Sequence, residues 1–77
     1  MNKARRAKLN AIINGITDLK STLEEILDEE QDALDNMPES LQDSERYAHI
    51  EEAVDSMENA VDEMDDIIEY LETAMDQ

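Results

Sequence analysis

The side chains that could carry chemistry in this 77-residue sequence are one histidine and many carboxylates, because the sequence has no cysteine. His49 would need a glutamate three residues before it to form the Glu-x-x-His pattern of a di-metal helical bundle. That position holds Arg46. The acids between Asp62 and Asp66 lack the glycine of a calcium-binding loop. No serine and histidine pair has an orienting acid near it. We therefore expect no catalytic residue, no dedicated metal site and no cofactor, and hence a protein that is not an enzyme.

The charge of the sequence is strongly acidic and unevenly placed. Asp and Glu number 22 against 6 Lys and Arg, for a net charge of -16. Residues 1–20 hold five basic residues and one acid, whereas residues 21–77 hold the other 21 acids and only Arg46. Such a chain repels nucleic acid, and it lacks the Phe and Trp side chains on which bases stack. We therefore expect no direct binding of nucleic acid.

Two further features bear on location. No apolar run approaches the roughly 20 residues that a membrane span needs. The basic start is not followed by the apolar segment of a secretory signal. We therefore expect no membrane partner. The absence of cysteine suits a reducing compartment.

The apolar residues recur in alternating steps of three and four, which is the spacing of a helical heptad. Each half of the chain carries a stripe about three positions wide in every seven, which fits a bundle better than a narrow coiled coil. No segment alternates with period two, so no strand is expected. In the first half, the positions predicted to face the core are Leu9, Ile12, Ile16, Leu19, Leu23, Ile26, Glu30, Ala33 and Met37.

The interruption between the two stripes predicts a turn. Pro38 is the only proline and disfavours helix at the residue before it. Ser40 with Asp43, or Ser44 alone, is expected to cap the second helix. We expect a single domain over residues 1–77, with a helix over about 3–35, a turn over about 36–43 and a helix over about 44–75. Helices of equal length, each about 50 Å long, and a short connection favour an all-α antiparallel hairpin.

Each predicted stripe is wider than one helix–helix contact, so a lone hairpin would leave apolar surface in water. Two hairpins that associate into a four-helix bundle would cover that surface. We therefore expect a homodimer, weakened at low salt by acidic repulsion. The residues expected in this core or dimer stripe are Ile16, Leu23, Ile26, Val54, Val61, Ile68 and Leu71.

The basic start has two interpretations. In a hairpin, Lys3, Arg5, Arg6 and Lys8 would lie beside the last acids of the second helix, among them Glu69, and pair with them. Alternatively, this basic tip touches phosphate or an acidic patch on a partner.

Most acids lie off the stripes and predict one extended acidic face. A solvated face usually mixes both signs of charge, because opposite charges four residues apart stabilise a helix. Here about 20 negative charges would lie along about 50 Å, one per about 2.5 Å, against one per roughly 1.7 Å in duplex DNA. The residues of the predicted partner-binding face are Asp55, Glu58, Asp62, Asp65, Asp66, Glu69, Glu72, Glu24, Glu25 and Asp28.

Three functions are compatible with these residues. The acidic face could imitate nucleic acid in the basic groove of an effector. The apolar stripe could dock on a partner protein, which would make the chain a structural or assembly adaptor. The third reading is a soluble bundle with some other task.

The turn carries a resemblance. The segment from Glu29 to Tyr47, followed by acidic Ala-Val-Asp heptads, resembles small acidic proteins of phages and mobile elements of Gram-positive bacteria. Some acidic proteins of such elements are anti-CRISPR inhibitors that occupy nucleic-acid grooves. The resemblance implies an inhibitor in the cytoplasm of a bacterial host, with a CRISPR effector or nuclease as partner.

Overall fold

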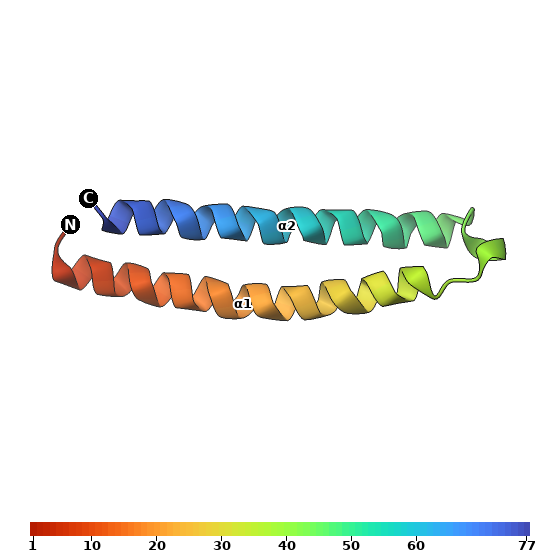
Figure 1. Cartoon of the computed structure of the whole chain (residues 1–77), viewed down its shortest axis with the longest axis horizontal. Helices are drawn as coiled ribbons and strands as arrows, with labels where there is room; N and C mark the ends of the chain where they lie inside the picture. The colour runs from red at the N-terminus through yellow and green to blue at the C-terminus, as the bar shows by residue number, and fades with distance from the viewer.

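The chain folds as an antiparallel hairpin of two long helices (Figure 1), and the computed structural model describes all 77 residues. Helix α1 is Lys3–Asp35, a short 3-10 helix η1 is Glu39–Leu41, and helix α2 is Glu45–Met75. Both termini lie at the end away from the turn. The Cα trace measures 59 × 16 × 12 Å. The predicted all-α class and the packed two-helix hairpin are confirmed.

Local hydrogen bonds explain where the helices begin and end. The Asn2 side chain accepts a hydrogen bond from the Arg5 amide at 2.8 Å, and the Ser44 hydroxyl accepts one from the Tyr47 amide at 3.2 Å. Each bond satisfies an amide that has no partner within its helix. Pro38, with extended backbone, precedes η1. Of the two predicted caps for α2, Ser44 is the one used.

The seam between the helices differs from the predicted one on α1. On α2, the stripe of apolar residues spaced three and four apart faces α1, and all its members are buried or half-buried: Tyr47, Ile50, Val54, Met57, Val61, Met64, Ile68, Leu71 and Met75. On α1, by contrast, three predicted core residues are largely exposed: Ile12 at 50%, Leu19 at 64% and Ile26 at 46%. The row one residue later takes their place in the seam: Ile13, Lys20, Leu27 and Leu34.

Geometry explains this correction. The α1 stripe comprises three adjacent rows, and a single partner helix covers only about two of them. We call the row of Ile12, Leu19, Ile26 and Ala33, which stays outside the seam, the excluded row. The row that enters the seam has Leu34 where the excluded row has Ala33, so the hairpin buries more apolar surface near the turn. Ile26 is therefore outside the core of the single hairpin.

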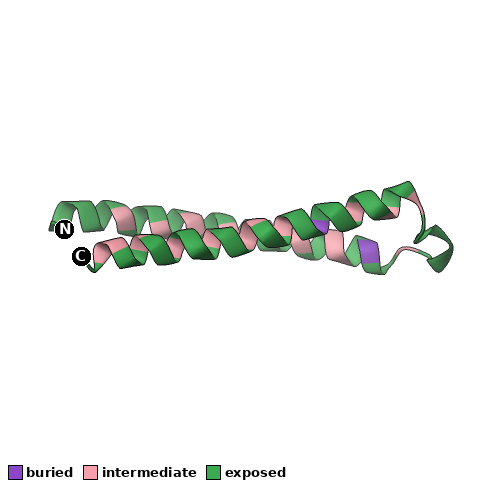
Figure 2. Cartoon of the chain, turned by 90° about the horizontal axis from the view of Figure 1, so that it is seen from above, coloured by how far each residue is buried: buried purple, intermediate pink, exposed green.

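The core is thin. Only Leu34, at 9% exposed, and Val54, at 3%, count as buried, and both lie in the half of the hairpin nearer the turn (Figure 2). The other seam residues are half-buried. Glu30 and Lys20 occupy seam positions that a better-filled core would give to apolar side chains.

Lys20 sits in mid-seam and is held by one acid. Its Nζ lies 2.6 Å from Asp65 Oδ1 on α2. The hydrogen bond to Asp65 raises the pKa of Lys20 above its ordinary value of 10.5, and the charges of Asp65 and Glu24 act in the same direction against a smaller opposing effect of desolvation. A single lysine in an apolar seam specifies register, because other alignments would separate it from its partner.

The basic start is placed as predicted, but its bonding differs. Arg6 Nε donates to the Met75 carbonyl at 2.9 Å, and the Met1 ammonium donates to the Gln77 carbonyl at 2.9 Å. No base of this segment forms an ion pair with Glu69 or its acidic neighbours. Arg6 and the Met1 ammonium instead satisfy carbonyls at and just beyond the end of α2, where the helix dipole is negative.

Because Val54 is the most deeply buried side chain, we expect Val54→Ala to lower the free energy of unfolding by about 1.5 kcal/mol, the value of two buried carbons at about 0.8 kcal/mol each. Urea titration followed by circular dichroism measures this. Asn59→Ala, on the exposed side of α2, is the control and should change stability by less than about 0.5 kcal/mol. Equal effects of the two variants would show that Val54 is not the core.

The raised pKa of Lys20 predicts a pH dependence. Its charged form is favoured in the folded state, so the stabilisation is complete below the ordinary pKa and is lost as pH rises through the folded value. We expect wild type to lose more stability than Lys20→Met as the pH rises above 10.5, the ordinary pKa of lysine. All other side chains are the same in the two proteins, so the comparison isolates Lys20. Parallel loss in the two proteins would refute the role of the Lys20–Asp65 pair.

Candidate functional site

A continuous row of carboxylates runs along α2. Starting at Glu51, every position reached by alternating steps of four and three residues is acidic, up to Asp76. At 1.5 Å per residue, this row places one carboxylate every roughly 5 Å along the helix. We call it the carboxylate ladder, and its members are Glu51, Asp55, Glu58, Asp62, Asp65, Glu69, Glu72 and Asp76.

Only one acid of the carboxylate ladder has a basic partner. Every acid of the protein is exposed except Glu30, which is half-buried. Only Asp65 forms an ion pair with a lysine or arginine. The other contact of this kind, between Glu45 and His49, measures 4.0 Å between two exposed side chains. The carboxylates therefore remain available to an outside cation.

Helix α1 adds acids to the same side of the hairpin. Lys20 reaches Asp65 on the ladder and is also influenced by Glu24, which lies one turn along α1. Glu24 therefore shares the side of the ladder, and Asp28 lies one turn beyond it. Of the other predicted acids, Glu25 and Asp66 lie on the outer edges of the two helices. All ten predicted acids are exposed, and seven of them belong to α2.

The opposite side of the hairpin is apolar. Because the side of α1 that carries Glu24 meets the ladder, the excluded row of α1 lies on the other flank of the seam. On α2, the row on that same flank begins with Arg46 near the turn and otherwise contains only alanine and isoleucine. We call these two rows together the open apolar face, and its members are Ile12, Leu19, Ile26 and Ala33 on α1 with Ala53, Ala60, Ile67 and Ala74 on α2.

Exposure confirms that the apolar surface gathers there. Large apolar residues of the two helices that remain exposed are Ile12, Leu19, Ile26 and Ile67, all on the open apolar face, together with Tyr70. Tyr70 is 74% exposed and lies one turn after Ile67, at the edge of this face. The hairpin thus has one acidic side and one apolar side.

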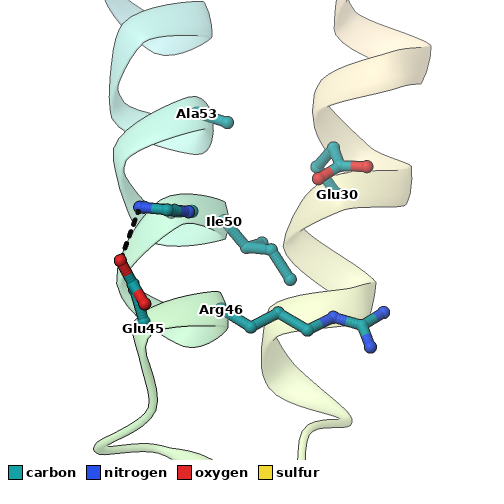
Figure 3. A pocket seen from close by; sticks show the side chains of 6 residues that line it. Glu30, Glu45, Arg46, Ile50 and Ala53 are labelled. Carbon is teal, nitrogen blue, oxygen red and sulfur yellow. Dashed lines mark ion pairs between the residues drawn. The ribbon is translucent and has the colours of Figure 1, made fainter.

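A shallow pocket lies at the turn end of the open apolar face (Figure 3). Ile50 and Ala53 on α2 form its apolar part, and Glu30 borders it from α1. The Arg46 side chain extends from α2 toward α1, while Glu45 and His49 pair along α2. The pocket is open and exposed, and its lining offers no enclosed group of reacting side chains.

Metal and membrane sites are not apparent in this geometry. No group of three or more histidine or acidic side chains is arranged to hold a metal ion. Neither helix combines the length and the apolar character required to cross a bilayer.

The length of the hairpin in the structure changes the charge density expected from the sequence. The net charge of -16 is spread over 59 Å, which is one charge per about 3.7 Å. Duplex DNA carries one charge per about 1.7 Å. A single hairpin therefore has a little less than half the charge density of DNA, and two hairpins side by side would come close to it.

No protein-family model, curated protein or solved structure matches this chain. The candidate site therefore rests on the geometry of the hairpin itself.

Sequence reasoning missed two features of this site. It did not identify Lys20 as a seam residue, although Lys20 lies seven residues from both Ile13 and Leu27 and so shares their row. It also did not separate the exposed row of α1 from the buried ones. The signal for both features was the row of Ile13, Lys20, Leu27 and Leu34. Its apolar content nearly equals that of the adjacent row of Ile12, Leu19, Ile26 and Ala33.

The ladder predicts a salt effect on stability, because its neighbouring carboxylates repel one another and salt screens them. We expect the melting temperature to rise by roughly 4–8 °C between 20 mM and 0.5 M NaCl, equivalent to about 1 kcal/mol. Circular dichroism at low protein concentration measures this. The variant Glu58→Gln, Asp62→Asn, Glu69→Gln should show a smaller rise. An unchanged or falling melting temperature in wild type would contradict ladder repulsion.

Proposed function

We propose that this protein is a non-enzymatic inhibitory binding protein whose carboxylate ladder occupies a basic groove built for nucleic acid. The observation that carries this proposal is the ladder itself: eight successive positions on one side of α2 are acidic, and a single lysine pairs with any of them. A basic groove would attract such a rod over a distance and bind it through many weak contacts.

Solubility alone is a poor explanation for the ladder. Like charges three or four residues apart destabilise a helix by about 0.2–0.5 kcal/mol per pair. A mixture of acidic and basic residues would keep the hairpin soluble without that cost. The core is thin, so this protein has little stability to lose. We infer that the continuous negative row is retained because a partner requires it.

We also propose that the binding form is a homodimer, a four-helix bundle of two hairpins. Two observations support it: the single hairpin buries only Leu34 and Val54, and its charge density is a little less than half that of DNA. A side-by-side pair would bring the density close to that of DNA.

The expected partner is a basic nucleic-acid-binding protein. The resemblance of the turn segment to proteins of phages and mobile elements points to a CRISPR effector or nuclease in the cytoplasm of a bacterial host. Inhibition would then be stoichiometric, by competition for the nucleic-acid channel.

A second function is favoured by the open apolar face. Ile12, Leu19 and Ile67 are 45–64% exposed, and such a face can dock on a partner protein. The chain would then be a structural or assembly adaptor. Salt separates the two functions, because competition through carboxylates weakens steeply with salt whereas apolar docking does not.

Reversal of ladder charges tests the proposed inhibition. We expect Glu58→Lys, Asp62→Lys, Glu69→Lys to fold normally and to bind its partner roughly tenfold or more weakly, because each exposed contact contributes about 0.2–1 kcal/mol and reversal adds repulsion. These positions leave the Lys20–Asp65 pair intact. The probe is a panel of purified RNA-guided nucleases from Gram-positive bacteria, and fluorescence anisotropy follows displacement of a labelled DNA duplex.

The matched control is Asp18→Lys, Asp32→Lys, Glu52→Lys, which changes the net charge equally but lies off the ladder. We expect it to displace the duplex nearly as well as wild type. If wild type displaces the duplex from no member of the panel, competition with this class is wrong. If the two triple variants are equally impaired, net charge and not the ladder is responsible.

A further inference from the structure

The open apolar face is large enough for a stable interface. The broad side of the hairpin measures 59 × 16 Å, a projected area of roughly 900 Å², and a standard protein–protein interface buries about 800 Å² on each partner. The exposed Ile12, Leu19, Ile26 and Ile67 are spread along this side and do not form a local patch. A partner that covers them must therefore lie along most of the hairpin.

Gly15 provides an independent indication of close approach. It is the only glycine, and it lies in the middle of α1 beside the open apolar face, between Ile12 and Leu19. Its backbone has no positive φ, and a Cβ atom built there would meet nothing within 4 Å. Nothing within the hairpin therefore requires this glycine, which lowers helix propensity. A glycine at this position would let a helix from outside approach the α1 backbone closely.

The charge pattern indicates what kind of partner fits. Along the outer edge of the open apolar face lie the neutral Thr22, Ser56 and Tyr70, with Lys8 and His49 in the same rows and acids at Glu29 and Glu63. A basic amphipathic helix would find few carboxylates to pair with here, because most of them lie on the ladder side. A second copy of this chain would meet a face as apolar as its own, and its ladder would point away from the interface.

We propose that a second copy of this chain docks on the open apolar face, so that two hairpins pack face to face with a carboxylate ladder on each outer side. This assignment rests on the proposed homodimer and is independent of competition with nucleic acid. In a two-fold interface each hairpin uses the same surface. Ile12, Leu19, Ile26 and Ile67 become core residues of the bundle, and Gly15 allows the helices to approach closely.

Two substitutions test the face in different ways. Leu19→Asp places a charge in the centre of the face, where the side chain is 64% exposed in the single hairpin. Gly15→Gln adds bulk while it improves helix propensity, so failure to fold cannot explain its effect. Sedimentation equilibrium at 10–200 µM protein in 0.3 M NaCl should give a dimer for wild type and at least a tenfold larger dissociation constant for each variant. Circular dichroism should show that both variants remain helical.

The matched controls, Thr17→Asp and Ser21→Gln, make the same kinds of change on the ladder side of α1 and should leave dimers unchanged. A wild type that is monomeric throughout this range would overturn the dimer itself, and a lone hairpin or an apolar docking partner would then be the better account. A wild-type dimer that survives both Leu19→Asp and Gly15→Gln would overturn the face assignment alone. The variant Glu58→Lys, Asp62→Lys, Glu69→Lys should still dimerise. A failure of competition with nucleic acid is therefore distinguishable from a failure of dimerisation.

Discussion

One helix can cover only about two of the three apolar rows that the other presents, and the rest of this structure depends on that limit. At the α1–α2 seam, α1 turns the row of Ile13, Lys20, Leu27 and Leu34 toward α2. The row of Ile12, Leu19 and Ile26 is therefore left in water. This orientation of α1 determines which side of the hairpin is apolar. It also places Lys20 in the seam, from which its side chain reaches Asp65 on the ladder side.

The two sides of the hairpin are stabilised by opposite surroundings. The ladder side is stabilised by water and salt, since its carboxylates repel one another and only Lys20 neutralises any of them. The open apolar side is stabilised by whatever removes it from water. A thin core built around Leu34 and Val54 holds the two sides together. Because that core is small, the association of a second hairpin would contribute a large part of the total stability.

Both proposals use this division of the surface without competing for it. Competition with nucleic acid requires the ladders to face outward, and dimerisation through the open apolar face leaves them outward. The pair would also supply the charge density that one hairpin, at one charge per about 3.7 Å, does not reach alone. In the basic start, Arg6 donates to the Met75 carbonyl, and none of the basic side chains there forms an ion pair with the ladder.

The sequence by itself determined the helices, the turn and the chemistry of each row. Heptad spacing, Pro38 and the Ser44 cap are local signals, and the two helices begin and end within about one residue of the expected positions. The ladder is also visible in the sequence, because its positions follow the apolar stripe of α2 by one residue. Only the tertiary structure decided which of two nearly equivalent rows of α1 enters the seam. That choice depends on the packing of Leu34 and on the reach of Lys20 to Asp65, residues 45 positions apart in sequence, which no local pattern contains.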